Sequence, residues 1–334
     1  MSNHTAVLEI TLVGFPGLAD AFHGLVSTMM FFAYIISLTA NGTVIGLVIF
    51  NEHLRQPMYL IIANLAASDL LFDTVTLPKA IAIYWFGAST IPVKMCLFQI
   101  FLVHYFGSLD SFLLMLMAID RYVAICHPLR YTSIITNKKI SISCGFCWII
   151  LSSSINTVAT ILASQLTLCG AYRVNSLFCG HTAYVAAACM DVSSSRNVAF
   201  VNSMIVLLIP LGLILMSYIK IIAVISMTRT ENLQKAFYTC VTHLLVIALY
   251  YTPRLFVYII SVLPFVTMRS DVNTVLLFLY SFVPHMANPI IYFLRTKEIK
   301  QTLRRVLLRS KFNMGWRQKR LTLRLGVDIR RMMM

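Results

Sequence analysis

Three acidic residues occur inside stretches that are otherwise apolar, where a carboxylate is costly. Asp69 and Asp73 lie four residues apart, so a helix places them on one face, and Asp110 lies within another apolar stretch. Three interpretations are open: protonated acids that share hydrogen bonds with nearby asparagines, oxygen ligands of a sodium ion, or a proton or ion path.

A second charged cluster, Asp120-Arg121-Tyr122, stands where a long apolar stretch, residues 97–119, comes to an end. Pro128 follows a few residues later, and proline ends a helix because it lacks the backbone N–H and restricts the residue before it. A charged pair at this depth is costly unless a partner holds it. The cluster therefore indicates a functional site; the alternative is an ion pair at the membrane interface without a further role.

The elements that position these residues are predicted to be membrane-spanning helices. The chain has 334 residues and is 59% hydrophobic but only 12% charged, whereas a soluble domain is about one quarter charged. A spanning helix needs roughly 20 mostly apolar residues. Seven stretches qualify, at about 25–50, 57–83, 95–122, 140–163, 198–225, 238–262 and 272–294. We therefore predict an all-α membrane protein, a seven-transmembrane helix bundle.

The positive charges predict the orientation of the bundle. Of the 27 Lys and Arg residues, 13 lie in the last forty residues, which favours contact with anionic membrane lipid and argues against nucleic acid as a partner. If this tail is cytoplasmic, 21 Lys and Arg residues lie inside and four outside, as the positive-inside rule requires. The N-terminal segment, residues 1–24, is then extracellular, and Asn3 of Asn3-His4-Thr5 is a candidate glycosylation site.

Four of the eight cysteines fall on the outer side in this topology: Cys96, Cys169, Cys179 and Cys189. An even number of cysteines in an oxidising compartment predicts two disulfides, and three pairings are open. A bridge from Cys96, at the start of span 3, would hold the long loop 164–197 over the bundle as a lid.

The segment after span 7 combines apolar and basic residues at helical spacing. Ile299 and Leu303 recur on one side of residues 295–310, and lysines and arginines fill the other side. This pattern predicts a short amphipathic cytoplasmic helix on the inner leaflet, followed by a basic cytoplasmic tail, residues 311–334.

Four separated segments each carry a distinctive motif: LRQPMY at 54–59, MAIDRYVAICHPLRY at 117–131, KAFYTCVTHL at 235–244 and PHMANPIIY at 284–292. In these segments the chain resembles the odorant (olfactory) receptors, which belong to the rhodopsin-like (class A) G-protein-coupled receptors. Ile119 stands where that family usually has Tyr or Phe. The resemblance covers about residues 25–305.

The resemblance implies a receptor that binds an odorant in the outer half of the bundle and activates a stimulatory olfactory-type G protein, which raises cAMP. It implies the plasma membrane as the location, in the cilia of olfactory sensory neurons. It also implies a sodium ion at Asp69, Asp110 and Asn288 in the closed state, and no other cofactor. The implied switch residues are Asp120, Arg121, Tyr122, Tyr218, Asn288, Pro289 and Tyr292, with Asp120 restraining Arg121 at rest.

By the architecture of that family, the odorant pocket lies between spans 3, 5, 6 and 7, under the lid. Val103 stands where amine receptors of the wider family carry an acid, so an amine ligand is disfavoured. The candidate ligand-binding residues are Val103, His104, Gly107, Ser108, Asn202, Ser203, Tyr251, Arg254, Tyr258, Phe278 and Ser281.

Arg254 is the unusual member of this set. A guanidinium just past Pro253 cannot be neutralised. If it faces the pocket, it would bind a carboxylate or sulfate through bidentate hydrogen bonds, with help from His104. The alternatives are that Arg254 pairs with an internal acid or extends to the surface, and that His104 is structural. We predict an acidic, water-soluble odorant with an apolar body.

Two other classes of function compete with a receptor. An ion-coupled membrane transporter would use Asp69 and Asp110, but the spans show no inverted repeat and no paired broken helices. An intramembrane enzyme would need catalytic motifs, and the sequence has no HExxH, no GxSxG and no P-loop. We therefore do not expect an enzyme.

Overall fold

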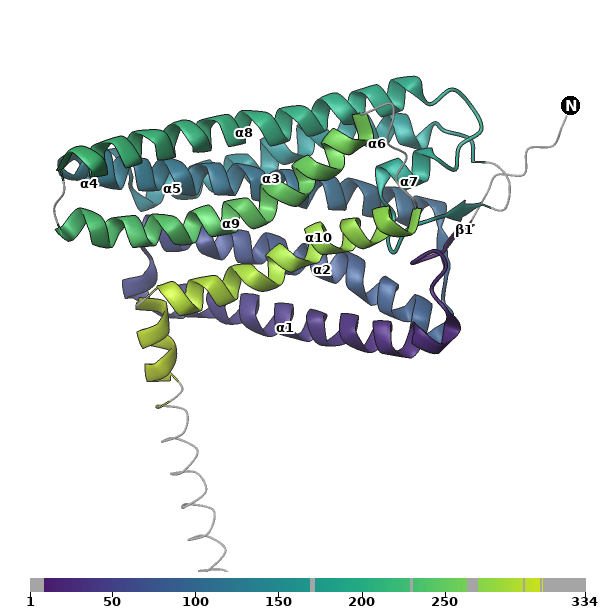
Figure 1. Cartoon of the computed structure of the whole chain (residues 1–334), viewed down its shortest axis with the longest axis horizontal. Coiled ribbons are helices and arrows are strands. Elements are labelled where there is room, and N and C mark those ends of the chain that lie inside the picture. The colour runs from purple at the N-terminus through teal and green to yellow at the C-terminus, as the bar shows by residue number, and fades with distance from the viewer. Residues whose placement is uncertain are drawn as a thin grey trace, which may run out of the picture.

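Seven long helical rods form one bundle in the computed structural model, which describes residues 9–168, 172–228, 231–262, 270–296, 298–306 and 308 (Figure 1). Six rods are single helices: α1 (His23–Phe50), α2 (Pro57–Phe86), α3 (Val93–Cys126), α8 (Ser193–Thr228), α9 (Glu231–Val262) and α10 (Ser270–Arg295). The remaining rod joins α5 (Asn137–Phe146), a π-helical turn (Cys147–Leu151) and α6 (Ser152–Ser164). The predicted all-α, seven-helix class is thereby confirmed.

The rods have the composition of membrane spans. Within the described residues, six of them contain a window long and apolar enough to cross a membrane, and α9 contributes a shorter apolar stretch, His243–Val257. Large apolar side chains such as Phe32 and Ile209 are exposed on the outer faces, while Leu65 and Leu109 are fully buried between the rods. A bundle that is apolar on the outside as well as the inside is a multi-pass membrane protein.

A small sheet closes one end of the bundle, at the right in Figure 1, and this end is called the sheet end below. Strand β1 (Glu9–Leu12) pairs antiparallel with β2 (Thr90–Pro92) and parallel with β3 (Arg173–Val174). Ile10 and Leu12 alternate with polar residues and are each 1% exposed. The sequence did not predict these strands, because runs of two to four residues are too short to show a pattern.

A disulfide between Cys96 and Cys179 fastens the long loop before α8 to the first turn of α3. This loop, called the lid below, also contains β3 and the short helix α7 (His181–Val185). The bridge from Cys96 was predicted, and the structure selects its partner among the three open choices. Cys169 lies outside the described residues, so the second predicted bridge stays a prediction.

At the opposite end of the bundle, called the Arg121 end, α3 stops at Cys126, two residues before Pro128. A 3-10 turn (Pro128–Arg130) and α4 (Tyr131–Ile134) follow. After α10 a short helix covers residues 298–306 and turns away from the bundle axis (Figure 1). Ile299 is buried, and Thr302 Oγ1 lies 2.8 Å from His53 Nε2. The predicted amphipathic helix, 295–310, thus overlaps an observed helix, whereas the 311–334 tail and Asn3 lie outside the described residues.

Candidate functional site

A cavity of about 100 Å³ lies near the sheet end, between α3, α6, α8, α9 and α10. Eight of the eleven predicted ligand residues line it: Val103, His104, Gly107, Ser108, Asn202, Ser203, Arg254 and Ser281. These residues come from four helices that are far apart in the sequence. The bundle therefore brings most of the predicted set around one space.

The other three predicted ligand residues are placed differently. Tyr251 is buried beside the cavity, and its hydroxyl lies 2.6 Å from Ser111 Oγ. Phe278 packs against Phe282, with ring centres 4.9 Å apart, and against Phe15 of the N-terminal segment. The side chain of Tyr258 lies outside the described residues.

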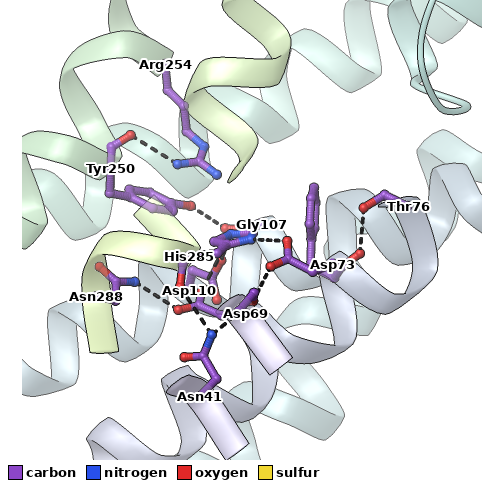
Figure 2. A network of polar contacts seen from close by, with 12 residues as sticks. Asn41, Asp69, Asp73, Thr76, Gly107, Asp110, Tyr250, Arg254, His285 and Asn288 are labelled. Atoms are coloured by element: carbon purple, nitrogen blue, oxygen red, sulfur yellow. Dashed lines mark hydrogen bonds and ion pairs between the residues drawn. The ribbon is translucent and has the colours of Figure 1, made fainter. Parts of the chain in front are cut away.

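Arg254 reaches the cavity from α9, one turn beyond Tyr250. Its guanidinium carbon lies 3.7 Å from the centre of the Tyr250 ring and 5.4 Å from that of Tyr280. Arg254 Nη1 donates a hydrogen bond to the Tyr250 carbonyl at 3.1 Å (Figure 2). The side chain is buried, and no ion pair between Arg254 and an acid occurs among the described residues. The two aromatic rings therefore stabilise the positive charge of Arg254 through cation–π contacts.

Two histidines lie side by side where the lid meets α3. The rings of His104, which lines the cavity, and His181, in α7, have centres 6.1 Å apart. His181 Nε2 lies 3.1 Å from Ser195 Oγ, and burial lowers the pKa of His181 to about 4. His104 Nε2 is buried without a hydrogen-bond partner in the described part of the chain. A ligand in the cavity can satisfy that nitrogen.

Several cavity residues were not predicted from the sequence. Phe72, Asn156, Phe178, Tyr250 and Tyr280 all line the space. Two of them could have been found from the sequence: Asn156 is a polar residue within an apolar span, and Phe178 is adjacent to the bridging Cys179. Asn156 Nδ2 donates to Ser108 Oγ at 2.9 Å, and Phe178 brings the lid into contact with the bundle core.

Below the cavity, the three buried acids surround a histidine of α10 (Figure 2). His285 Nδ1 lies 2.8 Å from Asp73 Oδ1. His285 Nε2 lies 3.5 Å from Asp69 Oδ1 and 3.7 Å from Asp110 Oδ2. All four side chains are 1% exposed. His285 was not among the predicted residues, because it belongs to span 7 and no local pattern links it to acids in spans 2 and 3.

Asparagine and serine side chains hold this acid cluster in place. Asn288 Nδ2 donates to Asp69 Oδ2 at 2.9 Å, and Ser37 Oγ donates to Asp73 Oδ2 at 2.5 Å. Asn41 Nδ2 donates both to Ser37 Oγ and to the His285 carbonyl. The predicted hydrogen bonds from asparagines to the acids are therefore present for Asn288, while Asn41 acts through Ser37.

Sodium was predicted at Asp69 and Asp110. Asp69 Oδ1 and both Asp110 oxygens are buried without a hydrogen-bond partner among the described residues, and such oxygens suit a hard cation. His285 Nε2, however, faces the same space and contributes nitrogen instead of oxygen. The donor set is thus mixed, and sodium binding stays a prediction.

At the Arg121 end, Asp120 forms two contacts. Arg121 Nη2 lies 3.0 Å from Asp120 Oδ2, and the Tyr131 hydroxyl donates to Asp120 Oδ1 at 2.8 Å. Asp120 is fully buried, whereas Arg121 is partly exposed and also contacts the sulfur of Met58. Burial, together with the charge of Asp120, raises the pKa of Tyr131, which therefore keeps its proton and donates.

The other predicted switch residues lie along the same half of the bundle. Tyr218 of α8 and Tyr292 of α10 are buried, and Asn288 and Pro289 lie one turn before Tyr292. The Tyr122 hydroxyl instead lies 3.3 Å from His127 Nε2, outside the Asp120 contacts. Three sites thus follow one another along the bundle axis: the cavity, the acid cluster and the Asp120–Arg121 pair.

Comparisons with known proteins agree with this arrangement. The family model described as "Olfactory receptor" matches residues 30–310. Olfactory receptor 1E16 of Mus musculus is 34% identical over 94% of this chain and 98% of its own length. Olfactory receptor 52K1 of Homo sapiens is 36% identical over 90% of this chain and 94% of its own length. The chain therefore belongs to the olfactory receptor family and is an odorant receptor of the G-protein-coupled receptor fold.

Proposed function

We propose that this receptor binds a small anionic odorant through Arg254 and His104 and activates a stimulatory G protein, which raises cAMP. The observation that carries the ligand class is a buried guanidinium that lines the cavity and has no carboxylate partner among the described residues. A buried charge without a counterion is costly. A carboxylate in the cavity would neutralise Arg254 and accept two of its N–H groups.

The surroundings of Arg254 support an anion over a neutral ligand. Tyr250 lies under the guanidinium and holds its plane by cation–π stacking. His104, also on the cavity wall, offers a nitrogen that has no hydrogen-bond partner among the described residues. Phe72, Val103 and Phe178 line the cavity as apolar surface. This combination suits a ligand with one charged head and a short apolar body.

The size of the cavity limits the ligand. An apolar cavity of roughly 150 Å³ holds a molecule as large as benzene. A cavity of about 100 Å³ is smaller and by the same scale suits ligands of about four non-hydrogen atoms. Short-chain carboxylic acids meet both the size and the charge condition.

The path from the cavity to the G protein runs along α3. Gly107 and Ser108 line the cavity, and Asp110 belongs to the acid cluster one turn further on. Asp120 and Arg121 lie near the end of the same helix. Binding at one end shifts the equilibrium between resting and active states only through a difference in affinity for them. An outward swing of α9 would then free Arg121 for the G protein.

The charge distribution supports the orientation that this mechanism needs. The Arg121 end faces the cytoplasm and the sheet end faces outward, because most Lys and Arg residues lie in the connecting segments and the C-terminal tail that adjoin the Arg121 end. The receptor then lies in the plasma membrane of the cilia of an olfactory neuron, with the cavity open to odorants from outside.

A cAMP assay in receptor-expressing cells tests the proposal. The panel pairs each short-chain acid with the alcohol and methyl ester of the same chain. Arg254→Ala should reduce the potency of acids by about 10- to 100-fold, the value of a charge-assisted hydrogen bond, and should leave neutral ligands unchanged. Arg196→Ala removes an exposed arginine at the start of α8 and serves as the matched control.

Two results would overturn the anionic ligand: equal loss of response to acids and neutral analogues, or no loss for any ligand. Coupling is tested separately with Arg121→Ala, which should abolish the cAMP response while the amount of receptor at the cell surface is unchanged. A full response in cells that lack stimulatory α subunits would contradict the proposed G protein.

A further inference from the structure

We propose that Asp69, Asp110 and His285 form a binding site for a divalent transition-metal ion of the zinc class, which links α2, α3 and α10. One potential ligand atom from each residue lies within 4.8 Å of the other two, and all three side chains are buried. None of the three lines the odorant cavity. The site is therefore independent of the proposed anionic odorant.

The distances suit ligands around one metal better than they suit direct hydrogen bonds. His285 Nε2 lies 3.5 Å from Asp69 Oδ1 and 3.7 Å from Asp110 Oδ2, whereas N–H···O bonds are about 2.7–3.2 Å long. His285 Nε2 and Asp110 Oδ2 are without a hydrogen-bond partner within the described chain, as is Asp69 Oδ1. Zinc bonds of about 2.0–2.2 Å place tetrahedral ligands about 3.4 Å apart. The two distances from His285 Nε2 are thus close to the separation that a shared metal requires, and the three ligand atoms all lie within 4.8 Å of one another.

The groups behind the ligands also match a metal site. A metal-ligating histidine usually donates its other ring N–H to a carboxylate, which fixes the ring and raises its basicity. His285 Nδ1 lies 2.8 Å from Asp73 Oδ1, and Ser37 holds the second oxygen of Asp73. Asn288 likewise donates to the Asp69 oxygen that faces away from the site. The contact with Asp73 orients His285, and the contact with Asn288 orients Asp69 (Figure 2).

The charge balance favours a divalent cation. Asp69, Asp73 and Asp110 bring three carboxyl groups into the bundle, and His285 is the basic partner that the described residues supply. Buried acids in a membrane need compensation. A divalent ion balances the charges of Asp69 and Asp110, while His285, neutral as a ligand, still donates its Nδ1–H to Asp73. A fourth position is open to the second Asp110 oxygen, which has no partner among the described residues, or to water.

The histidine distinguishes this site from one that prefers sodium. Hard cations such as sodium and calcium take oxygen ligands, whereas imidazole suits zinc, copper and nickel. Zinc accepts imidazole and carboxylate ligands together, so one nitrogen and two carboxylates fit it. Because the ligands come from three helices, a bound metal would favour the state in which α2, α3 and α10 stay together.

Purified full-length receptor in lipid nanodiscs provides the test. Zn²⁺ should raise the Tm in a saturable way, because an ion that binds only the folded state stabilises it. Co²⁺ should give a visible absorption band that Zn²⁺ displaces. His285→Asn should abolish both signals, and Asp73→Asn should weaken Co²⁺ affinity by about 10- to 100-fold, the usual cost of removing such a support.

His243→Asn is the matched control, because His243 is also buried in the bundle and no ion pair with an acid is found for it in the described residues. It should keep both metal signals. If His285→Asn does not fold, Asp110→Asn replaces it, and the Co²⁺ band of the unaltered receptor still gives a result. A Tm that responds to Na⁺ but not Zn²⁺, an absent Co²⁺ band, or equal loss in His243→Asn would overturn the proposal.

Discussion

The guanidinium of Arg254 stacks on the ring of Tyr250, one helical turn earlier in α9, at 3.7 Å from the ring centre. The Tyr250 hydroxyl also donates to the carbonyl of Gly107 on α3. One tyrosine thus holds the charged group of the cavity and ties α9 to α3. The two roles belong to different parts of the side chain, the ring and the hydroxyl, so that substitutions can separate them.

Tyr250→Leu should weaken the response to acidic odorants, because it removes the aromatic face under Arg254. Tyr250→Phe should keep it, because the ring stays. An exposed cation–π contact contributes about 0.5–1 kcal/mol and a desolvated one about 2 kcal/mol, so the expected loss for Tyr250→Leu is about 10- to 30-fold in EC50. The measurement is the cAMP dose response to acids. Equal potency of the two variants would show that the ring does not position Arg254.

The contact between Asp120 and Tyr131 predicts a change in basal activity. Asp120 holds Arg121 with one oxygen and accepts the Tyr131 hydroxyl with the other. Asp120→Asn should raise basal cAMP because it removes the charge that restrains Arg121. Tyr131→Phe should raise basal cAMP less, because it leaves the charge of Asp120 in place and removes one hydrogen bond to it, which contributes about 1.5–3 kcal/mol. Tyr122→Phe, whose hydroxyl contacts His127 instead, is the control and should stay at the unaltered level.

Much of the helical architecture could be predicted from the sequence because local chemistry determines it. Apolar stretches of spanning length, Pro128 after α3 and the Asp120-Arg121-Tyr122 motif all act within one helix or at its end. The place of the cavity was expected from the resemblance to the odorant receptors, and helical spacing then only selected the residues of α3 and α9 that could line it.

The features that the sequence did not predict depend on contacts between segments that are far apart in the chain. His285 meets Asp73 across 212 positions in the sequence, and no local pattern indicates that contact. Strand β1 is stabilised by β2 and β3, about 80 and 160 residues further on, and strands this short carry no periodicity of their own. Asn156 carried a polar signal within its span but needed Ser108 of α3 to give it a role.

The lid should lose stability in acid because of His181. Burial lowers the pKa of this histidine to about 4, whereas an unfolded histidine has a pKa of about 6.5. The unfolded lid therefore binds more protons between these values, and stability falls as the pH drops from about 6.5 towards 4. The total effect is at most about 3 kcal/mol.

Hydrogen exchange of the lid at pH 7.5 and pH 5 measures this effect, and the protection factors, which correct for the slower intrinsic exchange in acid, should be lower at pH 5. His181→Gln, which does not titrate, should remove the pH dependence and keep a hydrogen-bonding group beside Ser195. His104, whose ring lies 6.1 Å away, is the neighbouring titratable group, so His104→Gln is examined in parallel. An unchanged pH response in His181→Gln would assign the effect to another residue.

Gly14 should be intolerant of any side chain, for two reasons that a matched pair of variants separates. Its φ of +75° disfavours other residues, and a Cβ there would collide with the Tyr84 hydroxyl, which accepts a hydrogen bond from Phe15 N at 2.6 Å. Gly17 has almost the same φ, +77°, but open space around its Cβ position. Gly17→Ala therefore reports backbone strain alone, about 1–2 kcal/mol, and Gly14→Ala should lower the Tm of the purified receptor further. Adding Tyr84→Phe to Gly14→Ala should recover part of that extra loss, because it removes the atom in the way. Equal Tm values for the two alanine variants would mean that the N-terminal segment does not pack on Tyr84 in the membrane.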